Sequence, residues 1–413
     1  MIRFIHTADI HFGMENYGRI DPVTGIHSRL IDFNTSLNTC IDYAIEQQVD
    51  LFVFAGDAYK TAHPSPTQQK LLMKSFMRLY QANIPVVIAV GNHDNPLSFG
   101  KANALDIFAH LPVDGFYVFS KPNTQVIETK SGPVQIVGIP WPNRHNLTLN
   151  NPQYAQSVPE LTKQISESLA NIIQTLAQEL TPTVPAILVG HLTVSSGVFS
   201  GSEKRAVYGQ DPILLPSQLA IKPFDYIALG HLHRFQNLNK KGDIPIIYSG
   251  SIDRIDFGER KEDKGFCDVT INKKYDTTIN FIPLQTRPFI QIETTLTEDE
   301  DHTEQILQEI KKHTIKDAII KILYKIPAHI TDTVNIKQIQ KYCSKAIYIV
   351  GIIPIRSIQT RAHRNIVKHD MDLETLLKTY FNTQEHLKKR TNTLTKKALR
   401  LDELIEEKDD QES

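Results

Sequence analysis

The chain has 413 residues, a length that favours two or three domains over one. Hydrophobic residues at 41% and charged residues at 22% are typical of globular proteins, and no apolar run approaches the roughly 18 residues of a membrane helix, which argues against a disordered or membrane-spanning protein. The formal net charge of −1 gives no overall basic field, so any attraction to nucleic acid must come from local patches, bound metals or a partner.

The N-terminus and the cysteines indicate a cytoplasmic protein. The opening segment MIRFIHTADIHFG is too polar for a signal peptide. Cys40, Cys267 and Cys343 form no CxxC pair, which suits a reducing compartment and offers no thiolate metal site. Any metal must therefore be held by other ligands.

From residue 1 to 285, short apolar strands alternate with amphipathic helices, the pattern of a layered α/β domain. Five predicted strands each lead into a polar cluster. The strands are residues 3–7, 51–55, 86–90, 186–189 and 226–228, and the clusters read DIH from Asp9, GD from Gly56, GNHD from Gly91, GH from Gly190 and GHLH from Gly230. Because functional groups gather at the carboxyl ends of strands in open α/β sheets, we expect these clusters to form one site.

A second, smaller domain is predicted at residues 286–356. Residues 289–294 have the pattern of a strand, 302–313 of a helix and 318–326 of an alternating strand, and a further helix and strand end near Pro354. A segment of roughly 70 residues is long enough for a separate core.

The remaining residues, 357–413, are predicted to be helical. One helix carries apolar side chains at i, i+3, i+4, i+7 and i+8, and a second has a heptad-like seam from Leu387 to Ile405. The first face consists of Leu373, Leu376, Leu377, Tyr380 and Phe381. The tail is either a helical hairpin packed on its own body or an arm that binds a partner.

The polar clusters supply enough ligands for two metal ions. In two of them the ligand-type side chains are two residues apart, so in extended chain both point to one face. Carboxylate, amide and imidazole groups suit divalent cations, and two ions ~3.5 to 4 Å apart can orient a hydroxide and neutralise a phosphate under attack. The candidate ligands are Asp9, His11, Asp57, Asn92, His191, His231 and His233.

Each cluster alone is weak evidence, because DxH or GH after a strand also occurs in ordinary turns. Histidines without a spacing partner are expected to be structural, namely His6, His63, His110, His145 and His313. Five clusters in this order, each behind a predicted strand, are poorly explained by chance.

The ordered clusters resemble the calcineurin-like metallophosphoesterase superfamily, whose motifs are DxH, GDxx, GNH[DE], GH and GHxH. The resemblance implies a four-layer α/β sandwich, with a small α/β capping domain and a helical arm after it. It also implies one metal held by Asp9, His11, Asp57 and His233, and another held by Asp57, Asn92, His191 and His231. His93 would then be an unliganded imidazole that stabilises the scissile phosphate or protonates the leaving oxygen. Oxygen and nitrogen ligation suits manganese, and iron or zinc would also fit.

Residues 250–259 read GSIDRIDFGE and residues 264–266 read KGF, which resembles a signature of the SbcD family of nuclease subunits. Thr286-Arg287-Pro288-Phe289 is similar to that family's entry into a DNA-capping domain. The resemblance implies 3′-to-5′ cleavage of double-stranded DNA, endonucleolytic cutting of single strands and hairpins, and a cytoplasmic, nucleoid-associated role in repair and recombination. It also implies a homodimer bound to a coiled-coil ATPase of SbcC type, since the chain has no GxxxxGK[ST] loop of its own.

Several residues have two readings. The helices expected at 67–81 and 101–111 either pair two subunits or belong to the core; their apolar residues are Leu71, Leu72, Phe76, Leu79, Ile107 and Phe108. The basic clusters Lys240-Lys241, Arg260-Lys261-Lys264 and Arg361 to Arg364 are candidate phosphate contacts or solvated loops. Arg254 is expected to pair with Asp256 or Glu259, and Lys60 either contacts DNA phosphate or alters the surroundings of the metals.

Two other functional classes stay open on the sequence alone. One is a small-molecule or protein phosphoesterase with the same metal site, against which the second domain and the tail argue. The other is a non-enzymatic scaffold for DNA ends, which the loss of a motif residue would have suggested; all five motifs are intact.

Overall fold

The computed structural model describes most of the chain. The residues described are 1–96, 101–142, 157–201, 211–240, 242, 244–298, 300–327, 331–356, 371–383 and 386–409. The expected positions His145, Lys241 and Arg361 to Arg364 lie outside these ranges.

Two six-stranded mixed sheets form the centre of the first domain. The first has the order β14 (Asp276–Pro283), β13 (Gly265–Lys273), β1 (Ile2–Thr7), β2 (Leu51–Phe54), β3 (Val86–Ala89) and β4 (Phe116–Phe119). The second has the order β11 (Gln236–Asn237), β12 (Ile246–Tyr248), β10 (Tyr226–Gly230), β7 (Ala186–His191), β6 (Gly132–Ile139) and β5 (Asn123–Thr129). A short ribbon joins β8 (Thr193–Val194) to β9 (Ile213–Leu214).

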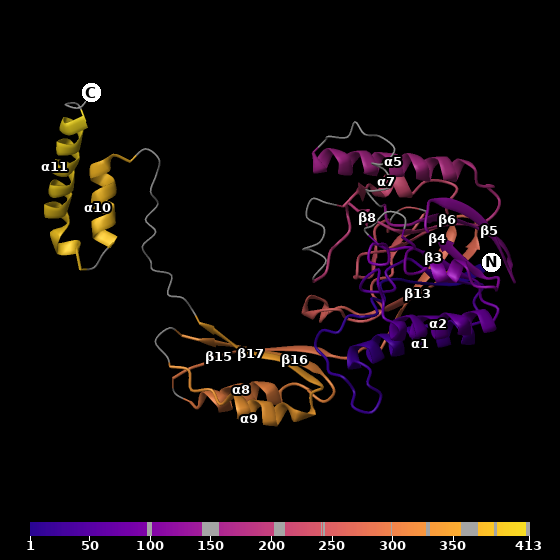
Figure 1. Ribbon diagram of the computed structural model, residues 1–413, viewed down its shortest axis with the longest axis horizontal. Coiled ribbons are helices and arrows are strands. Elements are labelled where there is room, and N and C mark those ends of the chain that lie inside the picture. The colour runs from indigo at the N-terminus through magenta and orange to yellow at the C-terminus, as the bar shows by residue number, and fades with distance from the viewer. Residues whose placement is uncertain are drawn as a thin grey trace.

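Helices cover the outer face of each sheet, which gives four layers (Figure 1). α1 (Ser28–Glu46), α2 (Pro66–Gln81) and α3 (Asp106–Ala109) pack on the first sheet, and α5 (Val158–Gln178) and α7 (Pro216–Leu219) pack on the second. Phe4, Val53, Val87, Val189 and Ala228 fill the space between the sheets and are fully buried. The expected four-layer α/β sandwich is confirmed.

The inner strands are apolar on both faces because each sheet is covered on both sides. β2 and β3 are buried at every position. α2 begins with Ser65, whose hydroxyl accepts from the backbone N–H of Gln68, and Pro66 occupies the first turn. The helix buries Leu72, Phe76 and Leu79 against the first sheet.

The helix expected at residues 101–111 is shorter than predicted, since α3 spans only Asp106–Ala109. The side chain of Asn103 accepts from the backbone N–H of Leu105 and donates to the Asp106 carboxylate. These local bonds compete with helix formation, which delays the start of the helix. Phe108 is buried in the core, whereas the side chain of Ile107 is 49% exposed.

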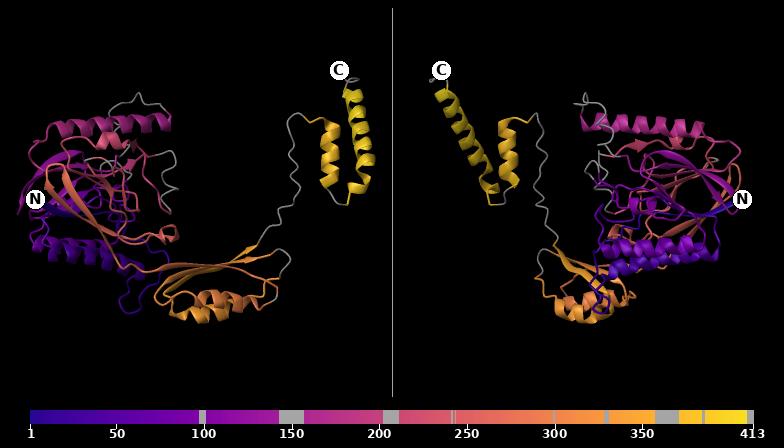
Figure 2. Two further views of the ribbon diagram at one scale, coloured as in Figure 1. Left: turned by 180° about the vertical axis from the view of Figure 1, so that it is seen from behind. Right: turned by 45° about the vertical axis from the view of Figure 1, so that its right-hand side comes forward.

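A second body of structure follows β14. β15 (Phe289–Thr295), β16 (Ile319–Ile326) and β17 (Tyr348–Arg356) form a parallel sheet, and α8 (His302–Lys311) and α9 (Ile336–Tyr342) cover one face of it (Figure 2). Ile292, Ile306, Ile310, Ile322 and Ile339 form a core of their own there.

Arginine contacts join the two bodies. The Arg287 guanidinium donates two hydrogen bonds to the Asp32 carboxylate in α1, at 2.8 and 2.5 Å. Arg254 donates to the Thr286 hydroxyl and to the backbone carbonyl of Glu262, not to Asp256 or Glu259 as the sequence suggested. Paired arginine bonds to a carboxylate fix orientation as well as distance.

The tail contains α10 (Leu373–Thr383) and α11 (Thr391–Asp409), which lie side by side and apart from both bodies (Figures 1 and 2). Leu373, Tyr380 and Leu401 are 43%, 58% and 61% exposed. In the part of the chain that the structure describes, no helix is both long and apolar enough to cross a membrane.

His6 in β1 lies between the two sheets and generates a prediction about acid stability. Its Nδ1 is 3.0 Å from the Tyr226 hydroxyl, and burial lowers the pKa of its imidazole from 6.5 to about 3. Below pH 6.5 the unfolded chain takes up a proton that the folded chain refuses, so the stability contributed by neutral His6 falls as the pH falls from 6.5 towards 3. Replacement by a residue that does not titrate removes this dependence.

We expect the metal-free wild type to lose stability relative to His6→Gln by roughly 1 kcal/mol per pH unit below pH 6.5. Urea unfolding between pH 7.5 and 5 measures the difference. Parallel stability curves for the two proteins would show that His6 is not held neutral in the fold.

Candidate metal centre

The five polar clusters meet at one end of the two sheets. β1, β2 and β3 are adjacent and parallel in the first sheet, and β7 and β10 are adjacent and parallel in the second. Their carboxyl ends open on the same side, and all seven candidate ligands lie at the last residue of a strand, as His191 does in β7, or in the loops that follow the strands. The structure thus brings together residues that are up to 224 positions apart, from Asp9 to His233.

The loops that present the ligands have an unusual backbone. Four candidate ligands have a positive φ, a region that side chains other than glycine rarely adopt and that is concentrated at functional sites. They are Asp9 at 52°, His11 at 51°, Asp57 at 58° and His231 at 101°. Gly91 lies so close to Asp57 that a Cβ at this glycine would be 2.1 Å from the carboxylate Oδ1.

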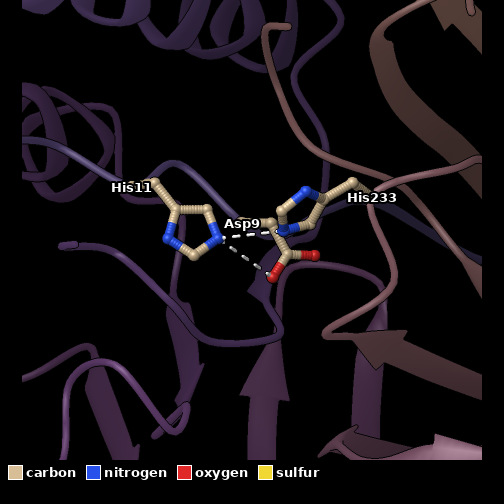
Figure 3. Close-up of side chains that lie close together, drawn as sticks. All are labelled: Asp9, His11 and His233. Atoms are coloured by element: carbon tan, nitrogen blue, oxygen red, sulfur yellow. Dashed lines mark hydrogen bonds and ion pairs between the residues drawn. The ribbon is translucent and has the colours of Figure 1, made fainter. Parts of the chain in front are cut away.

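The first group of ligands consists of Asp9, His11, Asp57 and His233, and Figure 3 shows three of them, Asp9, His11 and His233. His11 Nε2 is 3.1 Å from His233 Nε2, 4.0 Å from Asp9 Oδ1 and 3.7 Å from Asp57 Oδ2. All four side chains are buried.

The second group shares Asp57 and adds Asn92, His191 and His231. His191 Nε2 is 3.3 Å from Asp57 Oδ2 and 3.0 Å from Asn92 Oδ1. His231 Nδ1 is 3.2 Å from the same Asn92 oxygen. Asp57 Oδ2 is thus the atom that both groups face.

The hydrogen bonds behind the rings indicate which nitrogens face inward as lone pairs. His233 Nδ1 is 2.8 Å from Glu259 Oε1, and His191 Nδ1 is 2.8 Å from the Ala55 carbonyl oxygen. Both oxygens only accept, so each Nδ1 carries a proton, and once the ring is neutral the lone pair of Nε2 is directed at the other ligand atoms. Buried lone pairs and carboxylate oxygens that face one another need a cation between them, so the residues fit a pair of metal ions.

Charges within the site shift the pKa values in opposite directions. Burial raises the pKa of the Asp9 carboxyl to about 6. Burial would also raise the pKa of Asp57, but the imidazoles of His191 and His93 hold it below its usual range. Burial would lower the pKa of His191, and the Asp57 carboxylate outweighs this and raises it to about 9. A cation must therefore displace a proton from His191, and its binding weakens as the pH falls.

His93 lies at the edge of the site and is the exposed member. Its Nδ1 is 2.8 Å from the backbone carbonyl oxygen of Lys60, and its ring meets that of His11 edge to face, with 5.0 Å between centroids. Its backbone N–H donates to Asp57 Oδ1 at 2.9 Å. Lys60 thus orients His93 through its backbone, while its own side chain is exposed.

Glu259 supports the first group of ligands and had no role assigned from the sequence. It is fully buried, it accepts from His233, and its second oxygen is 2.9 Å from the amine of Lys264. Burial would raise its pKa, but Lys264 and His233 hold that pKa at about 2. The prediction that Lys264 contacts phosphate is therefore wrong, because its side chain is 1% exposed and its amine is already paired with Glu259.

Asp94 holds the loop that carries Asp57. Its side chain accepts from the backbone N–H groups of Gly91, Asp57, Ala58 and Tyr59 at 2.8 to 3.2 Å. The fourth letter of the GNHD motif was the available signal for this residue. Asp211 and Trp141, which lie beside His231, are outside every motif.

Comparison with known proteins gives one family. A family model described as calcineurin-like phosphoesterase matches residues 2–235, which include all seven candidate ligands. A solved dimetal phosphatase from Danio rerio is 10% identical with a TM-score of 0.39, over 68% of this chain and 98% of that one. A solved protein from Thermus thermophilus is 13% identical with a TM-score of 0.36, over 68% of this chain and 99% of that one. Likenesses this weak say nothing about the substrate of this chain.

The contact between Glu259 and His233 leads to a prediction about metal affinity. A carboxylate behind a metal-binding imidazole fixes its tautomer and orientation, and its loss typically weakens binding by roughly 10- to 100-fold. We expect Glu259→Gln to weaken manganese binding to this extent in isothermal titration calorimetry. Glu262→Gln is the matched control, since Glu262 also contacts Lys264 but not His233. Equal losses in the two variants would mean that Lys264, and not the bond to His233, determines affinity.

Proposed function

Because this chain belongs to the calcineurin-like phosphoesterase family, we propose that it is a two-metal phosphodiesterase that cuts DNA, as the nuclease subunit of an SbcC/SbcD-type complex. Metal-dependent hydrolysis of phosphoesters is the chemistry of the family. That the phosphoester belongs to DNA is the proposal. The observation that carries it is the position of the signature residues: Glu259 backs His233, and Arg254 reaches Thr286 at the entry to the second body.

The proposed metal sites follow the two groups of ligands. Asp9, His11, Asp57 and His233 would hold one cation, and Asp57, Asn92, His191 and His231 the other, with manganese as the expected ion. When bound, such a pair supplies an activated water and neutralises charge on the phosphate. The protein orients the ligands through Glu259, Asp94 and the Ala55 carbonyl oxygen.

His93 is proposed to act on the substrate directly. With Nδ1 held by the Lys60 carbonyl, its Nε2 is free to face a phosphate placed over the two groups of ligands. There it can donate a hydrogen bond to a phosphate oxygen or a proton to the leaving oxygen. The ligand atoms of His93, His11 and Asp57 also lie within 4.8 Å of one another, so a ligand role for His93 has to be tested separately.

The presence of the second body favours a large substrate over a phosphomonoester. It is anchored to the first by Arg287 and Asp32, and by Phe257 of the signature, whose ring packs on Phe289 with 5.1 Å between centroids. These contacts place the signature segment between the metal ligand His233 and the second body. A small-molecule phosphoesterase needs no such body beside its metal site.

DNA cleavage in manganese is the direct test of the proposed function. We expect the purified chain, with its ATPase partner and ATP present, to degrade linear double-stranded DNA and to nick hairpins. Asp57→Ala should remove this activity, because the cations then lack their shared anion. Hydrolysis of p-nitrophenyl phosphate without any cleavage of DNA would favour a phosphomonoesterase instead.

His93→Ser separates a catalytic role from the alternatives. We expect manganese content, melting temperature and DNA affinity to stay at wild-type values while cleavage falls by roughly 100- to 10,000-fold, the usual contribution of general acid catalysis. Loss of one manganese per chain in the variant would make His93 a ligand. Unchanged cleavage would remove it from the mechanism.

The partners follow from the exposed apolar surfaces. We propose that α10 and α11 bind the coiled coil of an SbcC-type ATPase through the face with Leu373, Leu377 and Tyr380, since Leu373 is 43% and Tyr380 58% exposed and Leu377 is half-buried. We also propose a homodimer through α2 and α3, where Ile107 is exposed, and a cytoplasmic location at the nucleoid.

Truncation after Asp370 tests the assignment of the tail. The truncated chain should keep the melting temperature of the full chain and fail to co-purify with the ATPase, because the binding face is gone. Co-purification at full yield would give the tail another purpose.

A further inference from the structure

Trp141 is the only tryptophan of the chain. It contacts the three segments that carry Asn92, His191 and His231, the ligands that belong to the second group alone. Its ring centroid is 4.7 Å from that of His231, at an interplanar angle of 37°, and 6.0 Å from that of His191. Its backbone N–H donates to the Val90 carbonyl at 2.8 Å, two residues before Asn92. Trp141 follows the end of β6 and belongs to none of the five motifs.

The ring of His231 has weaker hydrogen-bonded support than the rings of His191 and His233. Its backbone is in the left-handed region, with φ at 101°. His191 and His233 each place one ring nitrogen 2.8 Å from an acceptor behind them, whereas Nε2 of His231 is 3.4 Å from Asp211 Oδ2 and has no closer hydrogen-bond acceptor among the described residues. The Asp211 contact is long, so packing helps to fix the plane of the ring: the indole lies over it, and the ring of His191 meets it edge to face with 5.3 Å between centroids.

We propose that Trp141 is a positioning residue for the second cation. Its indole packs on the face of His231 and keeps Nδ1 directed at the Asn92 oxygen, and Asp211 limits rotation from the opposite edge of the ring. The inference rests on the proposed pair of metal sites. It implies that a histidine of each site is held differently. The buried Glu259 holds His233 in the first site, and aromatic packing holds His231 in the second.

The role of the first group is independent of Trp141. The rings of His11 and His233 make no contact with the indole among the described residues, and Glu259 contacts His233 at Nδ1, whereas His233 faces His11 through Nε2. Loss of the indole should therefore empty one site and leave the other filled. A general loss of structure would weaken both.

The test is manganese stoichiometry and affinity, measured by calorimetry and elemental analysis after desalting. We expect two ions per wild-type chain, and for Trp141→Ala one retained ion and a second bound roughly 10- to 100-fold more weakly, the usual effect of removing support behind a ligand. Trp141→Phe keeps an aromatic face for His231 and should restore the second ion to within a few-fold of wild-type affinity. Tyr80→Ala, which removes a stacked ring from the far side of the domain, should bind both ions normally.

Fluorescence gives a second readout, because all tryptophan emission comes from this one position. Manganese bound beside His231 should quench the emission of the wild type with the midpoint of the ion that Trp141→Ala weakens, and Asp211→Asn should move that midpoint to higher concentration. Two ions with unchanged affinity in Trp141→Ala would overturn the inference. Fewer than two ions in the wild type would instead contradict the proposed pair of sites, and equal weakening of both ions in the variant would show a structural role only.

Discussion

The Asp57 carboxylate is the group on which the rest of the site depends. It is 2% exposed, its Oδ1 accepts from the backbone N–H of His93, and its Oδ2 faces His11 and His191 from opposite groups of ligands. A buried carboxylate is costly unless it is paired, and here the pairing must come from cations or from protonated imidazoles. The strained loop at Asp57, the close approach of Gly91 and the bonds to Asp94 all keep this one side chain in place.

The arrangement of strands explains how distant residues reach Asp57. The predicted strands at 51–55 and 86–90 are apolar on both faces, which is typical of strands covered on both sides, and parallel strands present their carboxyl ends together. Sequence periodicity predicted a layered α/β domain and the convergence of the clusters, whereas the four layers were implied by the resemblance to the metallophosphoesterases. It could not predict the late start of the helix expected at 101–111, which depends on the local bonds of Asn103.

Residues behind the ligands were harder to predict from the sequence. Glu259 was visible only as a letter of a signature, and Lys264 was taken for a surface cation because its charge alone does not show that it is buried against Glu259. Trp141 gave no signal, since its contacts join strands from both sheets and have no fixed spacing. Tautomers, pKa values and ring orientation all arise from such long-range contacts, so they follow from the structure and not from a motif.

Electron paramagnetic resonance of the manganese-loaded chain tests most directly whether Asp57 bridges two cations. Two manganese ions ~3.5 to 4 Å apart that share a carboxylate are exchange-coupled. If Asp57 bridges the ions, the wild type with two ions per chain gives the spectrum of a coupled pair. Asp57→Ala gives the spectrum of an isolated ion. An isolated-ion spectrum from the fully loaded wild type would contradict the bridging role of Asp57.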